Sequence, residues 1–227
     1  MAGKPGRDAG RTPSIAPPVP QKRLIFPARE DMKSKSAADD RPRADGGLDV
    51  ASLGASVGTP AFRLYILRHA RAAWAQPGQS DFDRALDDEG FAEAEVIAEE
   101  AADQGYRPDL ILSSTAMRCH QTAEPFHRTM SEELPITYVD SLYSGTVDTY
   151  AELAFAERQE KAVMIVGHNP MVEEFFFRLL GKAIAETAAP FGYPTAGLAI
   201  LDFDKRPTET DYSGACLAGF MAPSRVT

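Results

Sequence analysis

The sequence has few cysteines: its 227 residues include only Cys119 and Cys216, which form neither a C-x-x-C pair nor another metal-ligand spacing. Two isolated cysteines are typical of proteins from reducing compartments and exclude a disulfide-rich scaffold. The sequence also lacks a continuous apolar run of 18 residues, and its first residues lack the apolar stretch of a secretory signal. From these absences we expect a cytoplasmic protein with no membrane partner.

Basic residues are scarce in the larger part of the chain. Residues 1–61 hold 10 of the 24 Lys and Arg residues and 7 of the 33 Asp and Glu residues, which leaves 14 basic and 26 acidic residues in 62–227. The two parts therefore carry net charges of +3 and −12. This balance argues against a nucleic-acid partner, because binding a phosphate backbone requires a basic surface. A small anion remains compatible, since a few arginines in one cleft can bind it.

Aromatic residues are almost missing from the N-terminal part. Residues 1–60 are rich in Pro, Ala, Gly and charged residues. Such a segment cannot bury enough apolar surface to offset the entropy of ordering it, so we predict a disordered tail. Residues 61–227 are predicted to form one folded domain, because their length and apolar content suffice for a core.

Strand-like and helix-like patterns alternate after residue 61. The predicted strands lie at 62–67, 109–114, 135–139, 161–166 and 196–204. The predicted helices lie at 87–105, 114–126, 146–160 and 171–181, with Ser114 expected to cap the second of them. This alternation predicts an α/β fold of three layers, in which helices flank a mostly parallel central sheet.

Polar side chains follow three of the predicted strands at the point where each strand ends. The first strand runs into Arg68 and His69, the second into Ser114 and Arg118, and the fourth into His168. Ligands collect at the carboxyl ends of parallel strands. Guanidinium groups and helix N-termini bind phosphate well, and a neutral imidazole is a competent nucleophile toward phosphorus. The sequence therefore predicts a site for a tetrahedral phosphoryl group.

Four motifs carry a resemblance to a known family. The segments "LRHARAAW", "SDFDRALDDEG", "PDLILSSTAMRCHQTAE" and "VMIVGHNP" occur in this order between residues 62 and about 205. They resemble the histidine phosphatase superfamily, which has the phosphoglycerate mutase-like fold. Within it they are most similar to the short SixA-type branch of phosphohistidine phosphatases.

The resemblance implies a role for five residues. His69 would be the nucleophile that forms a phosphohistidine intermediate, and His168 would complete the pocket and stabilise the transferring charge. Arg68 and Arg118 would bind the phosphoryl oxygens, and Arg84 of "DFDRAL" matches a further phosphate-contacting arginine. No metal ion and no cofactor is implied, because the arginines supply the positive charge.

A general acid is missing from the motifs. Many members of the superfamily use a glutamate to protonate an alkoxide leaving group. The carboxylates nearest to the expected position are Asp140 and Asp148, and neither lies in a recognisable motif. The conjugate acid of an imidazole leaving group has a pKa of about 6.5, so it requires less help from an acid. This gap favours phosphohistidine as the substrate.

Three functions remain open at this point. The leading hypothesis is a phosphohistidine phosphatase whose partner is a phosphorylated protein, such as a histidine domain of a phosphorelay. A phosphatase or mutase for a small phosphorylated substrate is the first alternative, and the short connections between the motifs, which leave no room for a lid, argue against it. A non-catalytic phospho-binding module is the second, and it would not require His69.

Overall fold

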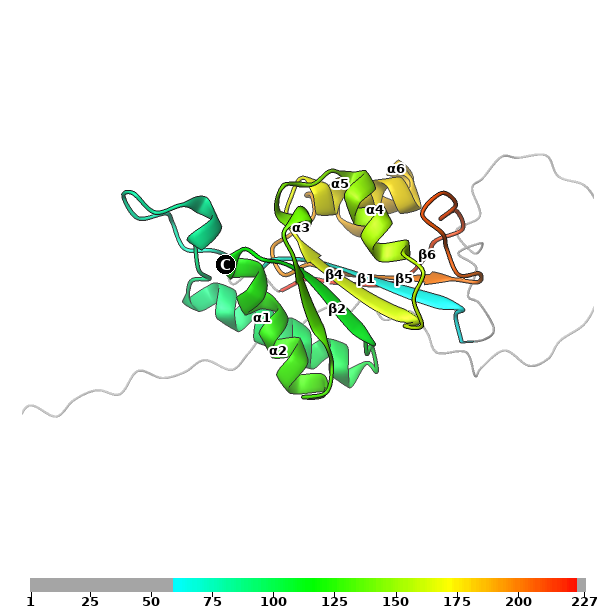
Figure 1. Ribbon diagram of the computed structural model, residues 1–227, viewed down its shortest axis with the longest axis horizontal. Coiled ribbons are helices and arrows are strands. Elements are labelled where there is room, and N and C mark those ends of the chain that lie inside the picture. Colours follow the sequence, from blue (N-terminus) through cyan, green and yellow to red (C-terminus); the bar gives the residue numbers. More distant parts are fainter. Residues whose placement is uncertain (1–58, 224–227) are drawn as a thin grey trace, which may run out of the picture. The chain divides into compact units, whose positions relative to one another are not determined.

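The computed structural model describes residues 59–223, so the predicted tail lies outside the described residues apart from its last two positions. Six strands form a single sheet in the order β3-β2-β4-β1-β5-β6 (Figure 1). Their bounds are Phe62–Arg68 (β1), Leu110–Ser114 (β2), Ile136–Val139 (β3), Ala162–Gly167 (β4), Leu198–Phe203 (β5) and Cys216–Met221 (β6).

Helices cover both faces of this sheet (Figure 1). The long helices α1 and α2 lie on one face, and α3 to α6 lie on the other. Their bounds are Asp88–Asp103 (α1), Met117–Met130 (α2), Ser141–Ser144 (α3), Val147–Phe155 (α4), Met171–Leu180 (α5) and Lys182–Ala188 (α6), with a 3-10 turn η2 at Asp81–Asp83. The predicted three-layer α/β fold is confirmed.

The central strand β1 shows why the sheet is buried on both sides. Its apolar residues alternate between the two cores because successive side chains of a strand point to opposite faces. Leu64 and Ile66 pack in the core that contains α4 and α5. Tyr65 and Leu67 pack in the core that contains α1 and α2, and all four are at most 1% exposed. Two-sided burial is typical of a central strand in an α/β sheet.

The pairing is parallel for β1–β4, β2–β4 and β2–β3 and antiparallel for β1–β5 and β5–β6. The mostly parallel sheet is therefore confirmed, although β5 departs from the regular alternation. After β4 the chain makes two helices in succession, α5 and α6, and returns to the carboxyl end of β1. There the carbonyl of Gly197 accepts a hydrogen bond from the backbone N–H of Arg68 at 3.0 Å. A strand that starts at this end must run antiparallel to β1.

Several local elements differ from the sequence prediction. The helix predicted at 146–160 ends at Phe155, where the guanidinium of Arg158 donates to the carbonyl of Leu153 at 2.7 Å. This side-chain bond satisfies a free carbonyl at the helix end. The sequence patterns also did not predict β6, α6 and the short elements α3 and η2. Strand β6 is an edge strand of intermediate burial. The elements α3 and η2 are single turns, which are too short for a periodic pattern.

Among residues 59–223, no helix has the combined length and apolar character that a membrane span requires.

Candidate active site

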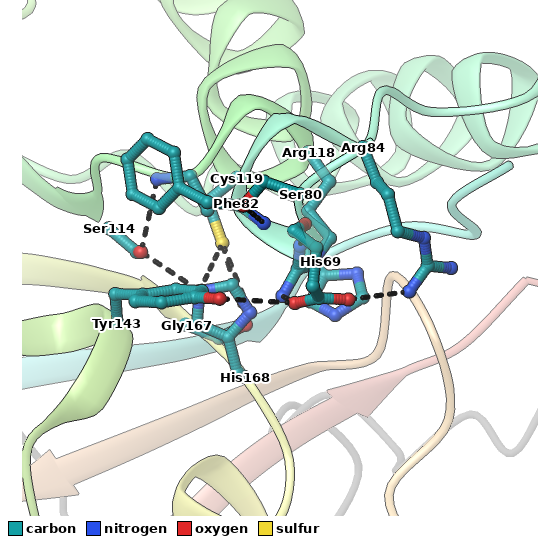
Figure 2. A network of polar contacts seen from close by, with 12 residues as sticks. His69, Ser80, Phe82, Arg84, Ser114, Arg118, Cys119, Tyr143, Gly167 and His168 are labelled. Carbon is teal, nitrogen blue, oxygen red and sulfur yellow. Dashed lines mark hydrogen bonds and ion pairs between the residues drawn. The ribbon is translucent and has the colours of Figure 1, made fainter. Parts of the chain in front are cut away.

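Two histidines from distant parts of the chain meet at the carboxyl end of the sheet. In the β1–β4 register Arg68 is opposite Gly167, so the residue that follows each strand lies beside the other. The backbone N–H of His69 donates to the carbonyl of Gly167 at 3.0 Å. The ring centroids of His69 and His168 are 5.1 Å apart (Figure 2). The parallel register thus brings the two predicted histidines together.

The ring of His69 has one defined neutral tautomer. Its Nδ1 lies 2.8 Å from the carbonyl oxygen of Ala70, and a carbonyl can only accept a hydrogen bond. Nδ1 therefore carries the proton, and the lone pair of the neutral ring is on Nε2. The pKa of His69 is lowered to about 4, mainly by burial and also by the nearby Arg118, Arg68 and Arg84, while the hydrogen bond to Ala70 raises it. At neutral pH this ring is therefore uncharged, with its lone pair on Nε2.

The ring of His168 is buried among polar and aromatic groups. Its Nε2 lies 2.8 Å from Oγ of Ser114 and 3.4 Å from Sγ of Cys119 (Figure 2). The ring of Tyr143 contacts it edge-on, with centroids 5.5 Å apart. The pKa of His168 is lowered to about 3, mainly by burial and also by His69 and Arg118. This imidazole is also neutral at physiological pH.

Ser114 does not have the role that the sequence predicted for it. The N-cap of α2 is Ala116, which makes no side-chain capping bond. The strand β2 continues through Ser114, so the helix starts three residues later than expected. The Ser114 hydroxyl accepts a hydrogen bond from the N–H of Ala116 at 3.3 Å and also contacts His168. The prediction of a helix cap was wrong, and the side chain belongs to the site.

A glycine at the end of β4 lets the strand approach a buried tyrosine. A Cβ atom on Gly167 would lie 2.2 Å from the hydroxyl oxygen of Tyr150. This hydroxyl donates to the carbonyl of Leu142 at 2.9 Å and accepts from the N–H of His168 at 3.2 Å. The contact fixes the backbone of His168 and leaves no room for a side chain at position 167.

Two of the predicted phosphate-binding arginines share one carboxylate. Arg118 donates to the backbone carbonyl of Asp81 at 2.6 Å and to its Oδ2 at 2.9 Å. Arg84 donates to Oδ1 of the same residue at 2.8 Å, and the hydroxyl of Tyr143 donates to Oδ2 at 3.2 Å. Figure 2 shows both arginines and the tyrosine converging on one region next to His69. Arg84, followed by Arg118 and Tyr143, lowers the pKa of Asp81.

The third arginine, Arg68, is held from a different side. Its Nη1 donates to the carbonyl of Tyr193 at 2.6 Å, and its buried Nε has no hydrogen-bond partner among the described residues. Burial lowers the pKa of this guanidinium, while Glu173 and Glu93 raise it. A buried donor without a partner is costly unless a ligand uses it, which is consistent with an anion site.

Among the described residues, neither of the two carboxylates suggested as general acids bonds to the paired histidines or to the three arginines. The side chain of Asp148 is 73% exposed and pairs with Arg178 on α5. Asp140 is exposed and directly precedes α3. The carboxylate at the site is instead Asp81, which the sequence analysis missed. It lies within the quoted "SDFDRAL" motif, three residues before Arg84, and this acidic-basic spacing was a usable signal.

Tyr143 had no such signal, because it lies on α3, a single turn that the pattern analysis did not predict. Cys119 lies fully buried in the core that contains α1 and α2, and its Sγ contacts Nε2 of His168. Burial raises the pKa of its thiol to about 12. Within the described part of the chain, no group of three or more His, Cys, Asp and Glu side chains could hold a metal ion.

Comparison with known proteins agrees with the motifs. Residues 64–162 match the model of the histidine phosphatase superfamily, branch 1. A SixA protein of Agrobacterium tumefaciens, provisionally assigned as a phosphohistidine phosphatase, is 46% identical to the chain. The structures superpose with a TM-score of 0.65, and the match covers 73% of this chain and 100% of that one. A second SixA structure, from Nakamurella multipartitia, has the same fold at 23% identity with a TM-score of 0.62.

A curated relative from a plant is more distant. An uncharacterized chloroplastic protein of Arabidopsis thaliana is 30% identical over 132 residues, which cover 54% of this chain and 61% of that protein. The chain therefore spans less than two thirds of the length of that relative.

The fold, the paired histidines and these matches assign the chain to a class: it belongs to the histidine phosphatase superfamily. Within the superfamily, the 46% identity over a whole SixA structure places it in the short SixA-type branch. The resemblance that the four motifs carry is thereby confirmed.

Proposed function

We propose that the protein is a phosphatase that hydrolyses phosphohistidine on a protein or peptide through a phosphoenzyme formed on His69. The supporting observation is the state of Asp81, the carboxylate that contacts the proposed phosphate-binding arginines. Arg84 and Arg118 hold it ionised, so it is a poor proton donor. A leaving alkoxide needs such a donor, whereas a leaving imidazole needs far less help.

The reaction then proceeds as two in-line transfers. The other ring nitrogen of the substrate phosphohistidine is protonated from solvent. Nε2 of neutral His69 attacks phosphorus while the P–N bond breaks, and the bonding electrons stay on the substrate ring, which leaves as neutral imidazole. Water next attacks the phosphorus on His69, releasing inorganic phosphate and restoring the neutral ring. Arg68, Arg84 and Arg118 bind the phosphoryl oxygens throughout and neutralise their charge.

His168 serves as a neutral donor in this mechanism. If the hydroxyl of Ser114 donates to Nε2 of His168, the ring proton is on Nδ1 and can bind a phosphoryl oxygen. Its low pKa keeps the ring uncharged, so it does not repel the neighbouring guanidinium groups. Ser114 acts through this ring and is a positioning residue.

The test is the ratio of kcat/KM for a phosphohistidine peptide to kcat/KM for p-nitrophenyl phosphate, with His69→Ala as the blank. A ratio well above one supports the proposal. A ratio well below one would indicate a small-molecule phosphatase with a general acid, and Asp81 would replace Asp140 as the first carboxylate to substitute. Phosphate binding without turnover of either substrate would indicate a binding module.

Acid-labile, alkali-stable labelling of the parent protein by a radioactive phosphoryl donor checks the intermediate separately. The label should be absent from His69→Ala. Unchanged hydrolysis by that variant would contradict the assignment of the nucleophile.

A further inference from the structure

The carboxylate of Asp81 occupies donors that a phosphoryl group would use. Nη1 of Arg84 donates to Oδ1, and Nη2 of Arg118 donates to Oδ2. A carboxylate and a phosphoryl group present similar pairs of oxygen acceptors to guanidinium forks. Substrate and Asp81 therefore compete for the same two arginines.

The burial of the partners indicates which of them moves. The side chain of Asp81 is 53% exposed, whereas that of Arg118 is only 7% exposed. Releasing the aspartate leaves its charge in water at little cost, while moving the arginine would leave its charge unpaired in the protein. The backbone of Asp81 remains attached to Arg118 through the carbonyl bond of 2.6 Å. The carboxylate can therefore swing aside while the turn η2 stays in place.

Aromatic contacts also hold this turn against the site. The ring of Phe82 packs edge-on against Tyr143, with centroids 5.0 Å apart. Tyr143 in turn contacts His168 and donates to Oδ2 of Asp81. These contacts keep the carboxylate close to the two arginines when it is displaced, so it can return.

We propose that Asp81 is an internal competitor for the phosphoryl site, which substrate displaces on binding and which displaces inorganic phosphate after the reaction. The proposal rests on the phosphate-binding roles given above to Arg84 and Arg118. A phosphoryl dianion carries more charge than a carboxylate and displaces it, while a monoanionic ligand competes less well. Asp81 thus selects for doubly charged ligands and weakens product inhibition.

The experiment measures the dissociation constant of inorganic phosphate for the full chain by isothermal titration calorimetry, at neutral pH and fixed ionic strength. The variant Asp81→Asn keeps the size of the side chain and removes its charge. Asp83→Asn is the matched control, because it removes the same charge from an exposed position of the same turn. Circular dichroism confirms that each variant is folded.

Asp81→Asn should bind phosphate roughly ten-fold more tightly than the parent, because two partly exposed ion pairs no longer have to be broken. Asp83→Asn should stay within about two-fold of the parent, since an isolated exposed charge contributes little. Unchanged or weaker binding by Asp81→Asn would overturn the proposal, and weaker binding would show that Asp81 merely positions the arginines. An equal gain in both variants would also overturn it, by attributing the effect to net charge.

Hydrolysis of the phosphohistidine peptide by the same proteins separates this proposal from the proposed function. Tighter phosphate binding by Asp81→Asn without any hydrolysis by the parent would support the competitor and contradict the phosphatase. Hydrolysis by the parent with no gain in phosphate affinity for Asp81→Asn would support the phosphatase and contradict the competitor.

Discussion

The hydroxyl oxygen of Ser114 lies 2.8 Å from Nε2 of His168, a residue 54 positions further along the chain. We expect Ser114→Ala to lower kcat about ten-fold, because it removes the hydroxyl that contacts Nε2 of this ring and orients it. Ser113→Ala is the control, since its hydroxyl is equally buried but donates to the carbonyl of Ser114. Nitrogen chemical shifts of the His168 ring should change in Ser114→Ala alone. Equal kcat losses in both variants would contradict the positioning role.

Acid should protonate His69 only far below the usual range of histidine. Its pKa of about 4 in the free protein predicts that kcat/KM is retained from pH 7 to about 5 and is lost as the pH falls through about 4. An NMR titration of the His69 ring gives the midpoint directly. Arg118→Met should move this midpoint upward, toward 6.5, because a cation that lowers the pKa has been removed. A midpoint near 6.5 in the parent protein would contradict the neutral, buried nucleophile.

Stability should depend on pH through the same two imidazoles. Both are neutral when folded, whereas in the unfolded chain they take up protons below about pH 6.5. The free energy of unfolding that these two groups contribute is therefore complete above about pH 6.5. It is lost as the pH falls toward about 4 for His69 and about 3 for His168. We expect the free energy of unfolding to drop by about 2 to 4 kcal/mol between pH 7 and 5 from these groups.

Denaturant unfolding at the two pH values measures this loss. The variant His69→Gln/His168→Gln should lose clearly less stability over the same interval. An identical loss in the variant and the parent would assign the pH dependence to other groups.

Gly167 should tolerate no larger residue while Tyr150 is present. The methyl group of Gly167→Ala would overlap the tyrosine hydroxyl, and we expect a loss of about 1 to 3 kcal/mol in the free energy of unfolding, together with lower activity. Tyr150→Phe removes the nearest atom of the overlap and also the bonds to Leu142 and His168. The double variant should be less destabilised than the sum of the single variants. Cε1 and Cζ of Tyr150 lie 2.7 and 2.8 Å from the position of the added methyl group, so Tyr150→Phe relieves only part of the overlap. Strict additivity in thermal or denaturant unfolding would exclude a contribution of the hydroxyl to it.

The layers of the fold could be predicted because they follow from patterns within short segments. The apolar run 64–67 and its counterpart 163–166 are typical of central strands, and both form as expected. The single turns η2 and α3 could not be predicted, because contacts with residues distant in the sequence stabilise their conformation. The contact of Phe82 with Tyr143 joins these two turns across 61 positions of the sequence.

The residues of the site could likewise be predicted only where a motif within a short segment contained them. The motifs indicated His69 and His168, and the parallel register of β1 and β4 places the two rings together. The neighbours of these rings were missed because a motif does not say what faces it. Ser114 was predicted to cap the helix because serine often begins a helix. In the structure α2 begins at Met117, three residues later, and the Ser114 hydroxyl contacts His168 instead. The chemical roles of these residues stay a prediction.

The position of β4 between β1 and β2 has a consequence for how the protein matures. The chain makes β1 and β2 first, yet they do not pair with each other, and each of them pairs with β4. During synthesis, residues 69 and 114 leave the ribosome well before the strand that must insert between them. Such long-range pairing is slow compared with the formation of local helices. The recovery of enzymatic turnover during refolding should therefore lag behind the recovery of helical circular dichroism and mark the closure of the central sheet.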